Sequence, residues 1–346
     1  FAEQYRPERS GACDPDALGG NLCRCTGYRP IRDAVAAVGP PAPGYFLDRL
    51  AKPAPTLRAL DYFADRARLE RPGNLAECLS SLSRYPKAKV ISGGTDLVVE
   101  SNLHFRRWSH LISLEGIEAL REFGDKPDAV RIGAGLPLGE IGRLWTDAPA
   151  SVSEWLELFG SPQIRNRATL GGNLATASPI GDSAPLLLAL NANLQAISIR
   201  GSRTLPLASF FTGYRTTTLE PDELIRAIEI PKPFPMFTRF YKASKRRMDD
   251  ISTVAAGLSI DLDANGTIKR AVFAFGGVAA SPLRVAAAEE VAQGKPWSPE
   301  TVEVIGQELD RVLSPIDDHR GSAAYRKAMA RNFVAKFYQE WAEADA

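Results

Sequence analysis

Two proline-rich positions constrain this chain most, because proline fixes its own backbone and donates no hydrogen bond to a helix or a central strand. The first is Gly39-Pro40-Pro41-Ala42-Pro43-Gly44, followed after a short gap by Lys52-Pro53-Ala54-Pro55. Proline at this density holds a chain extended, so residues 39–55 are predicted to form a surface linker. Pro231 and Pro233 mark the second position. The predicted division is therefore residues 1–38, the linker 39–55, residues 56–232 and residues 233–346.

Strand and helix patterns alternate between residues 56 and 232. Short apolar or alternating runs predict strands at 89–92, 129–134, 194–199 and 223–230. The capping-box pair Asn74 and Glu77 predicts a helix start, and Cys78 inside that helix is predicted to be a small core residue.

The last third begins with strand-like runs at 252–262 and 268–275. Asp263-Ala264-Asn265-Gly266 lies between them, and Asn-Gly after an alternating strand indicates a hairpin. The chain ends in helices. Five large side chains recur there at every fourth position, which places them on one helical face, and this face is predicted to be core: Tyr325, Met329, Phe333, Phe337 and Trp341.

Composition excludes several classes of function. The 346 residues carry 42 basic and 41 acidic side chains, a formal net charge of +1, which gives no electrostatic reason to expect nucleic acid or an anionic membrane as a partner. No apolar run approaches the roughly 20 residues that span a bilayer. Four cysteines do not make a disulfide scaffold in so long a chain, and they favour the cytoplasm. The start at Phe1 is no signal peptide and predicts that the sequence is part of a longer chain.

The first chemical signal is Gly20-Asn21-Leu22-Cys23-Arg24-Cys25-Thr26-Gly27-Tyr28-Arg29-Pro30-Ile31. Two cysteines one residue apart strain badly if joined, but both thiolates reach one metal centre, as iron–sulfur clusters require. A bare Cys-x-Cys is equally compatible with two free thiols. The segment ends in a predicted helix at 31–38.

The second signal is Lys89-Val90-Ile91-Ser92-Gly93-Gly94-Thr95-Asp96-Leu97. A strand that runs into paired glycines lets backbone N–H groups approach a phosphate. It is not the Gly-x-Gly-x-x-Gly dinucleotide fingerprint, and a double glycine alone is usually a turn.

The third signal is the run from Phe159 to Asp182, which includes Gly171-Gly172-Asn173. Its glycines permit close backbone approach, and Asn173, Thr169, Thr176 and Ser178 offer hydrogen bonds to phosphate and ribityl oxygens. Asp182 is placed to accept from ligand hydroxyls, and Phe159 to cover a planar ring. Without its companions the same run would be a polar loop beside a core Phe.

Together these segments resemble the xanthine dehydrogenase and aldehyde oxidase family, the molybdenum hydroxylases. The resemblance extends through Tyr241–Ile251 to Phe275-Gly276-Gly277-Val278-Ala279 and covers nearly the whole chain. It implies an α+β fold: a p-cresol methylhydroxylase-type FAD-binding domain at 56–232, followed by a C-terminal flavoprotein domain at 233–346 with a small antiparallel sheet plus helices.

Residues 1–38 resemble the C-terminal part of a helical [2Fe–2S] domain. In that family Cys23 and Cys25 match two of four cluster ligands. The Cys-Gly-x-Cys element that supplies the other two has no match here, and Cys13 is not promoted to a ligand.

The resemblance also implies a set of cofactor contacts. Carried over residue by residue, the FAD shell falls on Val90, Ile91, Ser92, Gly93, Gly94, Thr95, Asp96, Leu97, Phe159, Ala168, Thr169, Gly171, Gly172, Asn173, Thr176, Asp182, Leu224 or Ile225, and Lys242. Phe159 would lie against the isoalloxazine, and Lys242 at the pyrimidine edge, where a cation stabilises the anionic reduced flavin. Asp249 lies in a loop that, in the family, passes the flavin and influences access of NAD and oxygen. The alternative for Lys242 is a solvated basic face shared with Lys245, Arg246 and Arg247.

The implied function is an electron relay. Purine oxidation on a molybdopterin-binding large subunit would feed electrons through [2Fe–2S] clusters to FAD and then NAD, in a larger hetero-oligomer. Subunits of the carbon monoxide dehydrogenase type share this fold but carry their clusters on a separate chain. Two alternatives stay open. The partner subunit oxidises an aldehyde or another N-heterocycle, or the chain is a non-catalytic assembly or binding module that has lost FAD.

Overall fold

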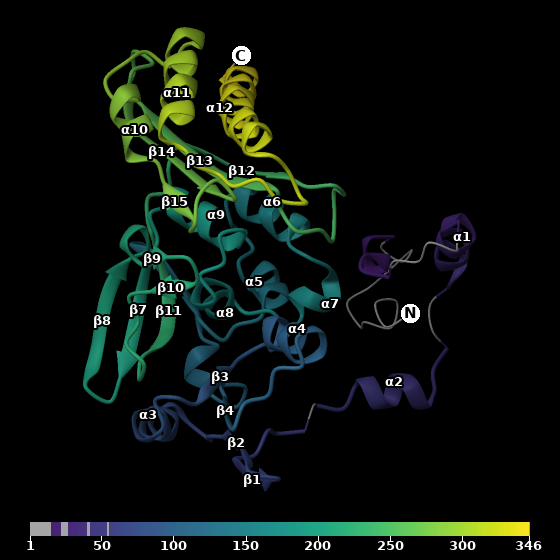
Figure 1. Cartoon of the computed structure of the whole chain (residues 1–346). Coiled ribbons are helices and arrows are strands. Elements are labelled where there is room, and N and C mark those ends of the chain that lie inside the picture. The colour runs from purple at the N-terminus through teal and green to yellow at the C-terminus, as the bar shows by residue number, and fades with distance from the viewer. Residues whose placement is uncertain (1–14, 22–26, 40–41, 54, 346) are drawn as a thin grey trace.

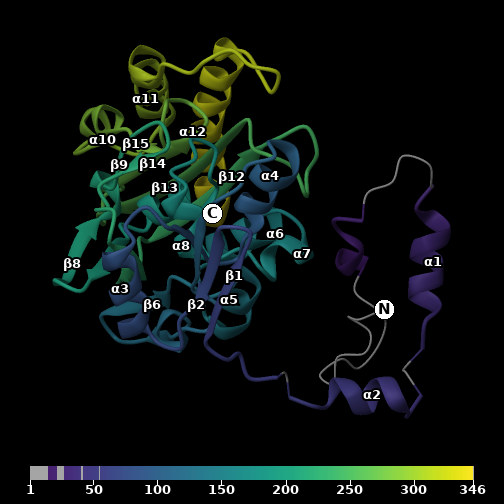
Figure 2. The ribbon, with the colours of Figure 1, turned by 60° about the horizontal axis from the view of Figure 1, so that its bottom comes forward.

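The described residues of 27–53 lie apart from the sheets in both ribbon views (Figures 1 and 2), whereas Gly20 lies against Ser161 and Gln163. The computed structural model describes residues 15–21, 27–39, 42–53 and 55–345. A 3-10 turn η1 (Pro15–Leu18) and helices α1 (Arg29–Ala37) and α2 (Tyr45–Leu50) precede the first strand. Among the described residues of 27–53, Val35 alone is buried. The predicted helix at 31–38 is confirmed by α1.

Contrary to what its proline content suggests, the surface linker predicted at 39–55 is not extended throughout. Tyr45–Leu50 forms α2, although no described residue of 42–53 is buried. The sequence has no proline between Gly44 and Lys52, so nothing in this stretch prevents helical hydrogen bonds, and the Asp48 N–H donates to the Gly44 carbonyl at 3.0 Å.

The first sheet joins four strands in the order β1-β2-β4-β3. Its strands are β1 (Leu60–Ala64), β2 (Ala67–Arg71), β3 (Lys89–Ile91) and β4 (His110–Ser113). Helices α3 (Leu75–Arg84) and α4 (Thr95–Leu103) are the crossovers that allow β2, β3 and β4 to pair in parallel. The predicted helix start and its Asn74 cap are confirmed, because Asn74 accepts from the Glu77 N–H, while Glu77 reaches back to the Gly73 N–H, one residue before the N-cap. Cys78 is fully buried beneath it.

The second sheet is antiparallel throughout, in the order β5-β6-β11-β7-β8. Its strands are β5 (Phe123–Asp125), β6 (Ala129–Gly133), β7 (Asn193–Ser198), β8 (Gly201–Pro206) and β11 (Leu224–Pro231); a short pair, β9 (Phe211–Gly213) and β10 (Thr216–Thr217), and two 3-10 turns, η2 (Glu118–Leu120) and η3 (Leu207–Ser209), accompany it. The strands predicted at 89–92 and 129–134 from apolar runs, and at 194–199 and 223–230 from alternation, are confirmed within one or two residues. In β7 buried and half-buried positions alternate, as a sheet with one core face requires.

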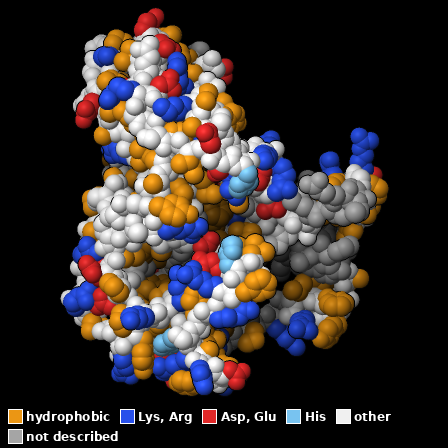
Figure 3. Space-filling model, in the orientation of Figure 1, with side chains coloured by type: hydrophobic (Ala, Val, Ile, Leu, Met, Phe, Trp, Pro, Cys, Tyr) orange, Lys and Arg blue, Asp and Glu red, His pale blue; other side chains and the backbone are white. Residues whose placement is uncertain are grey.

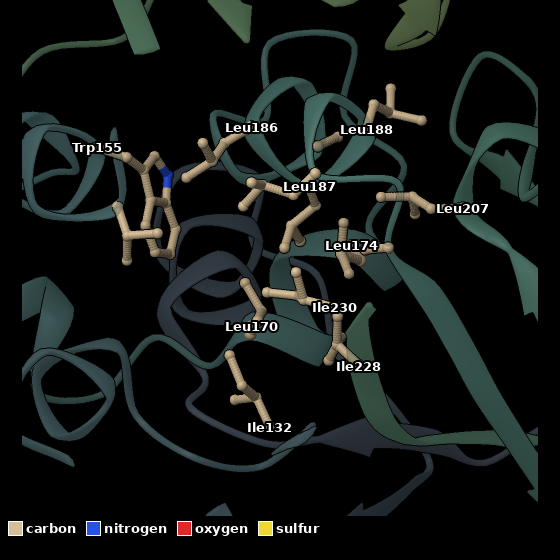
Figure 4. Close-up of a cluster of buried hydrophobic side chains, with 14 of the residues drawn as sticks. Ile132, Trp155, Leu170, Leu174, Leu186, Leu187, Leu188, Leu207, Ile228 and Ile230 are labelled. Carbon is tan, nitrogen blue, oxygen red and sulfur yellow. The ribbon is translucent and has the colours of Figure 1, made fainter. Parts of the chain in front are cut away.

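Five helices lie between β6 and β7 in sequence and cover the core face of this sheet. They are α5 (Leu138–Leu144), α6 (Ala150–Leu158), α7 (Pro162–Arg165), α8 (Leu170–Ala175) and α9 (Ser183–Ala189). Every residue of α9 is buried. Figure 4 shows the cluster that they form with the sheet, in which Leu186 and Leu187 of α9 lie opposite Ile228 and Ile230 of β11.

The third sheet has the order β12-β13-β14-β15. Its strands are β12 (Phe237–Ala243), β13 (Val254–Leu262), β14 (Ile268–Gly276) and β15 (Leu283–Arg284), and its helices are α10 (Ala286–Ala292), α11 (Pro299–Val312) and α12 (Ala323–Asp345). The predicted hairpin is confirmed: Asp263 accepts from the Asn265 and Thr267 N–H groups, and Gly266 adopts φ +75°. Figure 1 shows α10, α11 and α12 on the side of this sheet away from α9.

The predicted aromatic face of the last helix is core, with one exception. Phe337 is fully buried, while Met329, Phe333 and Trp341 pack half-buried against the same cluster. Tyr325 is 43% exposed, so its assignment to the core is wrong. It belongs to the first turn of α12, which lies over Gly321 of the preceding loop and not over the sheet.

The second and third sheets share one core. Phe240, Ala255, Val272 and Ala274 of the third sheet belong to the same buried cluster as the helices of the second. The backbone approach is close, since a Cβ on Gly257 of β13 would lie 2.1 Å from the Pro185 carbonyl oxygen of α9. The two sheets therefore sandwich α9. Among the helices that the structure describes, none combines the length and the apolar character that spanning a membrane requires.

Candidate functional site

The two glycine-rich segments meet in the fold, although they lie far apart in the sequence. A Cβ on Gly93 would lie 1.8 Å from the Arg167 carbonyl oxygen, so the backbones touch and only glycine fits there. The Thr169 hydroxyl donates to the Ser92 hydroxyl at 3.1 Å. Val90 and Ile91 are half-buried in β3 just before this contact, and Ala168 is buried beside it.

The first segment ends in a helix N-terminus without a side-chain cap. Gly94 adopts φ +77°, and no side chain caps the first turn of α4, which contains Thr95, Asp96 and Leu97. Uncapped N–H groups at the positive end of a helix dipole favour a phosphate. Asp96 is exposed and pairs with Arg215 at 3.5 Å, so its carboxylate faces a cation of this chain.

The second segment carries a buried amide oxygen with no partner among the described residues. A Cβ on Gly171 would lie 2.5 Å from the Ala134 Cβ, and the Gly171 N–H donates to the Ala134 carbonyl, so α8 presses against the end of β6. Thr169 caps α8 by accepting from the Gly172 N–H. The Asn173 Oδ1 is buried and accepts no hydrogen bond from the part of the chain that the structure describes. A buried acceptor in this state is destabilising unless a ligand or water donates to it.

A buried ion pair lies at the far end of the second segment. The Lys242 Nζ is 2.8 Å from the Asp182 Oδ2, and the two side chains are 1% and 9% exposed. Lys242 also donates to the Leu158 carbonyl at 2.9 Å, and the Ser252 hydroxyl donates to the other Asp182 oxygen. The alternative of a solvated basic face is therefore wrong for Lys242, whereas Arg246 and Arg247 nearby are largely exposed.

This pairing was not part of the sequence-based hypothesis, which assigned Lys242 to the flavin and Asp182 to ligand hydroxyls separately. Ser252 and the Leu158 carbonyl are the contributors that the sequence did not indicate. A single serine and a backbone carbonyl carry no sequence signal.

The remaining predicted contacts are less closely grouped. Phe159 is half-buried and packs edge-on against Trp155 at 5.7 Å between ring centroids. Thr176 donates to the Asn173 carbonyl at 2.8 Å. Leu224 and Ile225 begin β11 with buried side chains that enter two different core clusters.

Asp249 lies in the loop after β12 at φ +53°, and its carbonyl accepts from Arg246 Nη2 at 2.9 Å. Its neighbour Asp250 is tied down more firmly. Burial opposes the anion, but the backbone N–H groups of Arg246 and Ile251 and nearby cations together hold the pKa of Asp250 below its ordinary value. The loop is therefore organised around an ionised Asp250.

Cys23 and Cys25 lie outside the described residues, as does Cys13. Within the described ranges no group of three or more His, Cys, Asp or Glu side chains is arranged to hold a metal ion.

Comparison with known proteins identifies the family to which this architecture belongs. Residues 65–233 match the family model "FAD binding domain in molybdopterin dehydrogenase", and residues 239–341 match "CO dehydrogenase flavoprotein C-terminal domain". The xanthine dehydrogenase FAD-binding subunit of Escherichia coli O157:H7 is 31% identical over 283 residues, covering 80% of this chain and 96% of that protein. The chain belongs to the FAD-binding flavoprotein subunits of the molybdenum hydroxylase family.

Another relative of this flavoprotein is a longer protein. The xanthine dehydrogenase of Emericella nidulans is 30% identical over 96% of this chain, which spans 29% of that protein. Carbon monoxide dehydrogenase from Hydrogenophaga pseudoflava superposes with a TM-score of 0.73 at 28% identity, covering 80% of this chain and 96% of the solved one. Quinoline 2-oxidoreductase from Pseudomonas putida 86, at 24% identity and a TM-score of 0.72, shares the fold.

The site of this flavoprotein fits FAD on three observations. The α4 N-terminus is uncapped, the buried Asn173 oxygen has no donor among the described residues, and Asp182 holds the cation Lys242 at the end of the second glycine segment. The first suits a pyrophosphate, the second a hydroxyl and the third an anionic ring system.

Proposed function

We propose that the chain binds FAD between its two glycine segments and Lys242, and that it transfers electrons from a partner subunit to NAD. The observation that carries the proposal is the buried Lys242–Asp182 pair, because it joins the FAD-binding region to the C-terminal region and keeps a desolvated cation at the end of the second glycine segment. FAD, when bound, supplies the isoalloxazine that accepts electrons and delivers a hydride to a nicotinamide.

The residues of this chain bind and tune the cofactor in this proposal. The first turn of α4 and the Gly171-Gly172-Asn173 segment bind the pyrophosphate and ribityl chain, and Phe159 packs against the ring. Lys242 stabilises the reduced anionic flavin electrostatically, and Asp182 fixes its ammonium group. The remaining predicted contacts, Val90 to Leu97, Ala168, Thr169, Thr176 and Leu224 or Ile225, form the walls of the site. The loop with Asp249 influences the access of NAD and oxygen to the site.

The proposal extends to the assembly. We infer that residues 56–232 form a p-cresol methylhydroxylase-type domain and 233–346 the C-terminal flavoprotein domain. Residues 1–38 would contribute Cys23 and Cys25 to a [2Fe–2S] cluster whose other ligands lie elsewhere. A molybdopterin-binding large subunit oxidises a purine in a larger hetero-oligomer in the cytoplasm, where NAD is the acceptor. On the face that Figure 3 shows, basic and acidic side chains of the described residues are interspersed.

Flavin uptake and reduction test the proposal. The deflavinated chain should quench FAD fluorescence with a saturable 1:1 titration, and NADH should bleach the bound flavin under anaerobic conditions. A chain that takes up no FAD would refute the proposal and favour the assembly-module alternative. Bound flavin that NADH leaves oxidised would refute only NAD as the acceptor.

A second candidate function is the same electron transfer in an enzyme whose partner subunit oxidises carbon monoxide, an aldehyde or an N-heterocycle instead of a purine. The superposition on carbon monoxide dehydrogenase favours it, because 96% of that solved chain is covered by the match. The substrate pocket of such enzymes would lie on the partner subunit, so the assembled complex should be assayed with purines, aldehydes, N-heterocycles and carbon monoxide. Purine turnover at least tenfold faster than the others supports the xanthine dehydrogenase assignment.

A further inference from the structure

Arg326 is the largest fully buried side chain of the described residues. It lies in the first turn of α12, and its side chain is 2% exposed. Its Nη1 donates to the Thr253 carbonyl at 2.6 Å and to the Gly277 carbonyl at 2.8 Å, and its Nη2 pairs with the Asp318 carboxylate at 2.7 Å. A buried guanidinium is tolerated only with such a complete set of partners, so the three segments that it joins are fixed relative to one another.

Two of these segments lead directly to the Lys242–Asp182 pair. Thr253 follows Ser252, whose hydroxyl donates to the Asp182 carboxylate. The Gly277 N–H donates to the Pro179 carbonyl at 2.7 Å, just before Asp182 in the chain. Arg326 therefore braces Asp182 from both sides, although it contacts neither Asp182 nor Lys242.

The third segment reaches the loop after β12. The Lys245 Nζ donates to the His319 carbonyl at 3.1 Å, next to Asp318, and the Thr253 hydroxyl donates to the Arg320 carbonyl at 3.4 Å. Arg326 thus links the 317–321 loop to the segment that connects β12 with β13.

The competing explanation is that Arg326 only anchors α12. Arg331, farther along the same helix, provides the comparison. It pairs with Asp310 at 2.7 Å and Glu303 at 3.0 Å, both on α11, and neither ion pair leads to the glycine segments or to the loop after β12. Removing either arginine weakens α12 packing, but the contacts of Arg326 are the ones that lead to Asp182.

We propose that Arg326 is a positioning residue for the flavin: it holds Ser252 and Pro179 so that Asp182 presents the Lys242 ammonium group to the cofactor. The inference rests on the proposed FAD site. Arg326 lies in the last helix and is not among the predicted cofactor contacts. In this inference it nevertheless controls the affinity for FAD and the flavin potential.

The test compares Arg326→Met with Arg331→Met in the whole chain. The dissociation constant of FAD is measured by fluorescence quenching on deflavinated protein, well below the melting temperature of each variant, and the flavin midpoint potential is measured by dye equilibration. We expect R326M to raise the dissociation constant at least tenfold, about 1.4 kcal/mol, and to lower the potential. R326K should weaken FAD binding less than R326M does, since a lysine retains the charge and one carbonyl contact. R331M should lower the melting temperature but change the dissociation constant less than twofold.

Asp318→Asn serves if R326M does not fold, because it removes the charge of the carboxylate that pairs with Arg326 and leaves the backbone carbonyl contacts in place. We expect it to weaken FAD binding about threefold. The inference would be overturned if R326M, or D318N where R326M does not fold, kept the dissociation constant and the flavin potential of the wild-type chain. In that case FAD uptake by the wild-type chain would still uphold the proposed function. Failure of the wild-type chain to bind FAD would refute both.

Discussion

Replacement of Lys242 by methionine removes one partner of a buried ion pair and leaves the other without its counter-ion. The Lys242 side chain is 1% exposed and its ammonium group has two acceptors, Asp182 at 2.8 Å and the Leu158 carbonyl at 2.9 Å. Removing one member of a buried pair typically costs about 3–5 kcal/mol, because the remaining charge stays desolvated. We expect Lys242→Met to lower the free energy of unfolding by this amount.

The assay is urea unfolding of the deflavinated chain followed by tryptophan fluorescence. Lys336→Met is the matched control, because Lys336 is 56% exposed, pairs with Glu340 at 3.5 Å and lies 4.9 Å from the centroid of the Tyr241 ring, so its loss should cost less than about 1 kcal/mol. The double variant K242M/D182N contains no unpaired buried charge. It should be more stable than K242M by about 1–2 kcal/mol, since the neutral amide that replaces the carboxylate at position 182 still accepts from Ser252.

Two outcomes would refute this reasoning. A K242M variant as stable as K336M would mean that the pair is not buried in solution. Stability losses that simply add in the double variant would mean that Lys242 and Asp182 act independently. In the flavin-loaded chain, K242M should also lower the flavin midpoint potential, by about 30 mV for each 1.4 kcal/mol of lost two-electron stabilisation.

Three further predictions follow from single contacts. Gly93→Ala should lower the free energy of unfolding by about 1–3 kcal/mol and abolish FAD binding, because the added Cβ would meet the Arg167 backbone. Gly124→Ala is the control, since no atom lies within 4 Å of its Cβ, and it should change neither property. Urea unfolding and FAD titration measure the two properties. Burial raises the pKa of Cys78 to about 12, so a thiol reagent at about pH 8 should label its peptide only after unfolding; labelling in the folded chain would contradict this. Because the pKa of Asp250 is lowered in the folded chain, its ionised carboxylate stabilises the fold above the ordinary aspartate pKa of 3.8, and this stabilisation is lost as the pH falls through the folded pKa. The melting-temperature difference between wild type and Asp250→Asn should therefore shrink below about pH 3.8. A difference that does not change with pH would contradict this prediction.

Local features were predictable from the sequence because they depend on neighbouring residues. The hairpin at Asp263–Gly266 follows from the turn preferences of Asn-Gly, the strand at 129–134 from a short apolar run, and the strand at 223–230 from alternation. The helix at Tyr45–Leu50 was missed because prolines on both sides dominated a short segment with no apolar periodicity. Tyr325 was misassigned because helical spacing gives the face of a residue and not how far along the helix the core extends.

The candidate site was predictable only as a set of parts. Glycine segments carry a sequence signal, and Lys242 and Asp182 were both named, but 60 positions separate them and no local pattern indicates that they pair. The contacts of Arg326 were even less predictable, because Arg326 belongs to no sequence motif. Its partners are the backbone carbonyls of Thr253, Gly277 and Gly321 and one loop carboxylate, which come together only once the third sheet and α12 are in place.

The shared core of the second and third sheets restricts how such chains can be recombined. A gene fusion or exchange with a break near residue 232 would take Lys242 from one parent and Asp182 from the other, along with the Gly257 surface that fits against α9. A chimera would therefore inherit an anion and a cation that had not evolved together. Exchanges that carry β12, β13 and the first turn of α12 with the glycine segments would keep the pair intact, which makes the pair, and not the boundary between the two domains, the natural unit for building hybrid flavoproteins.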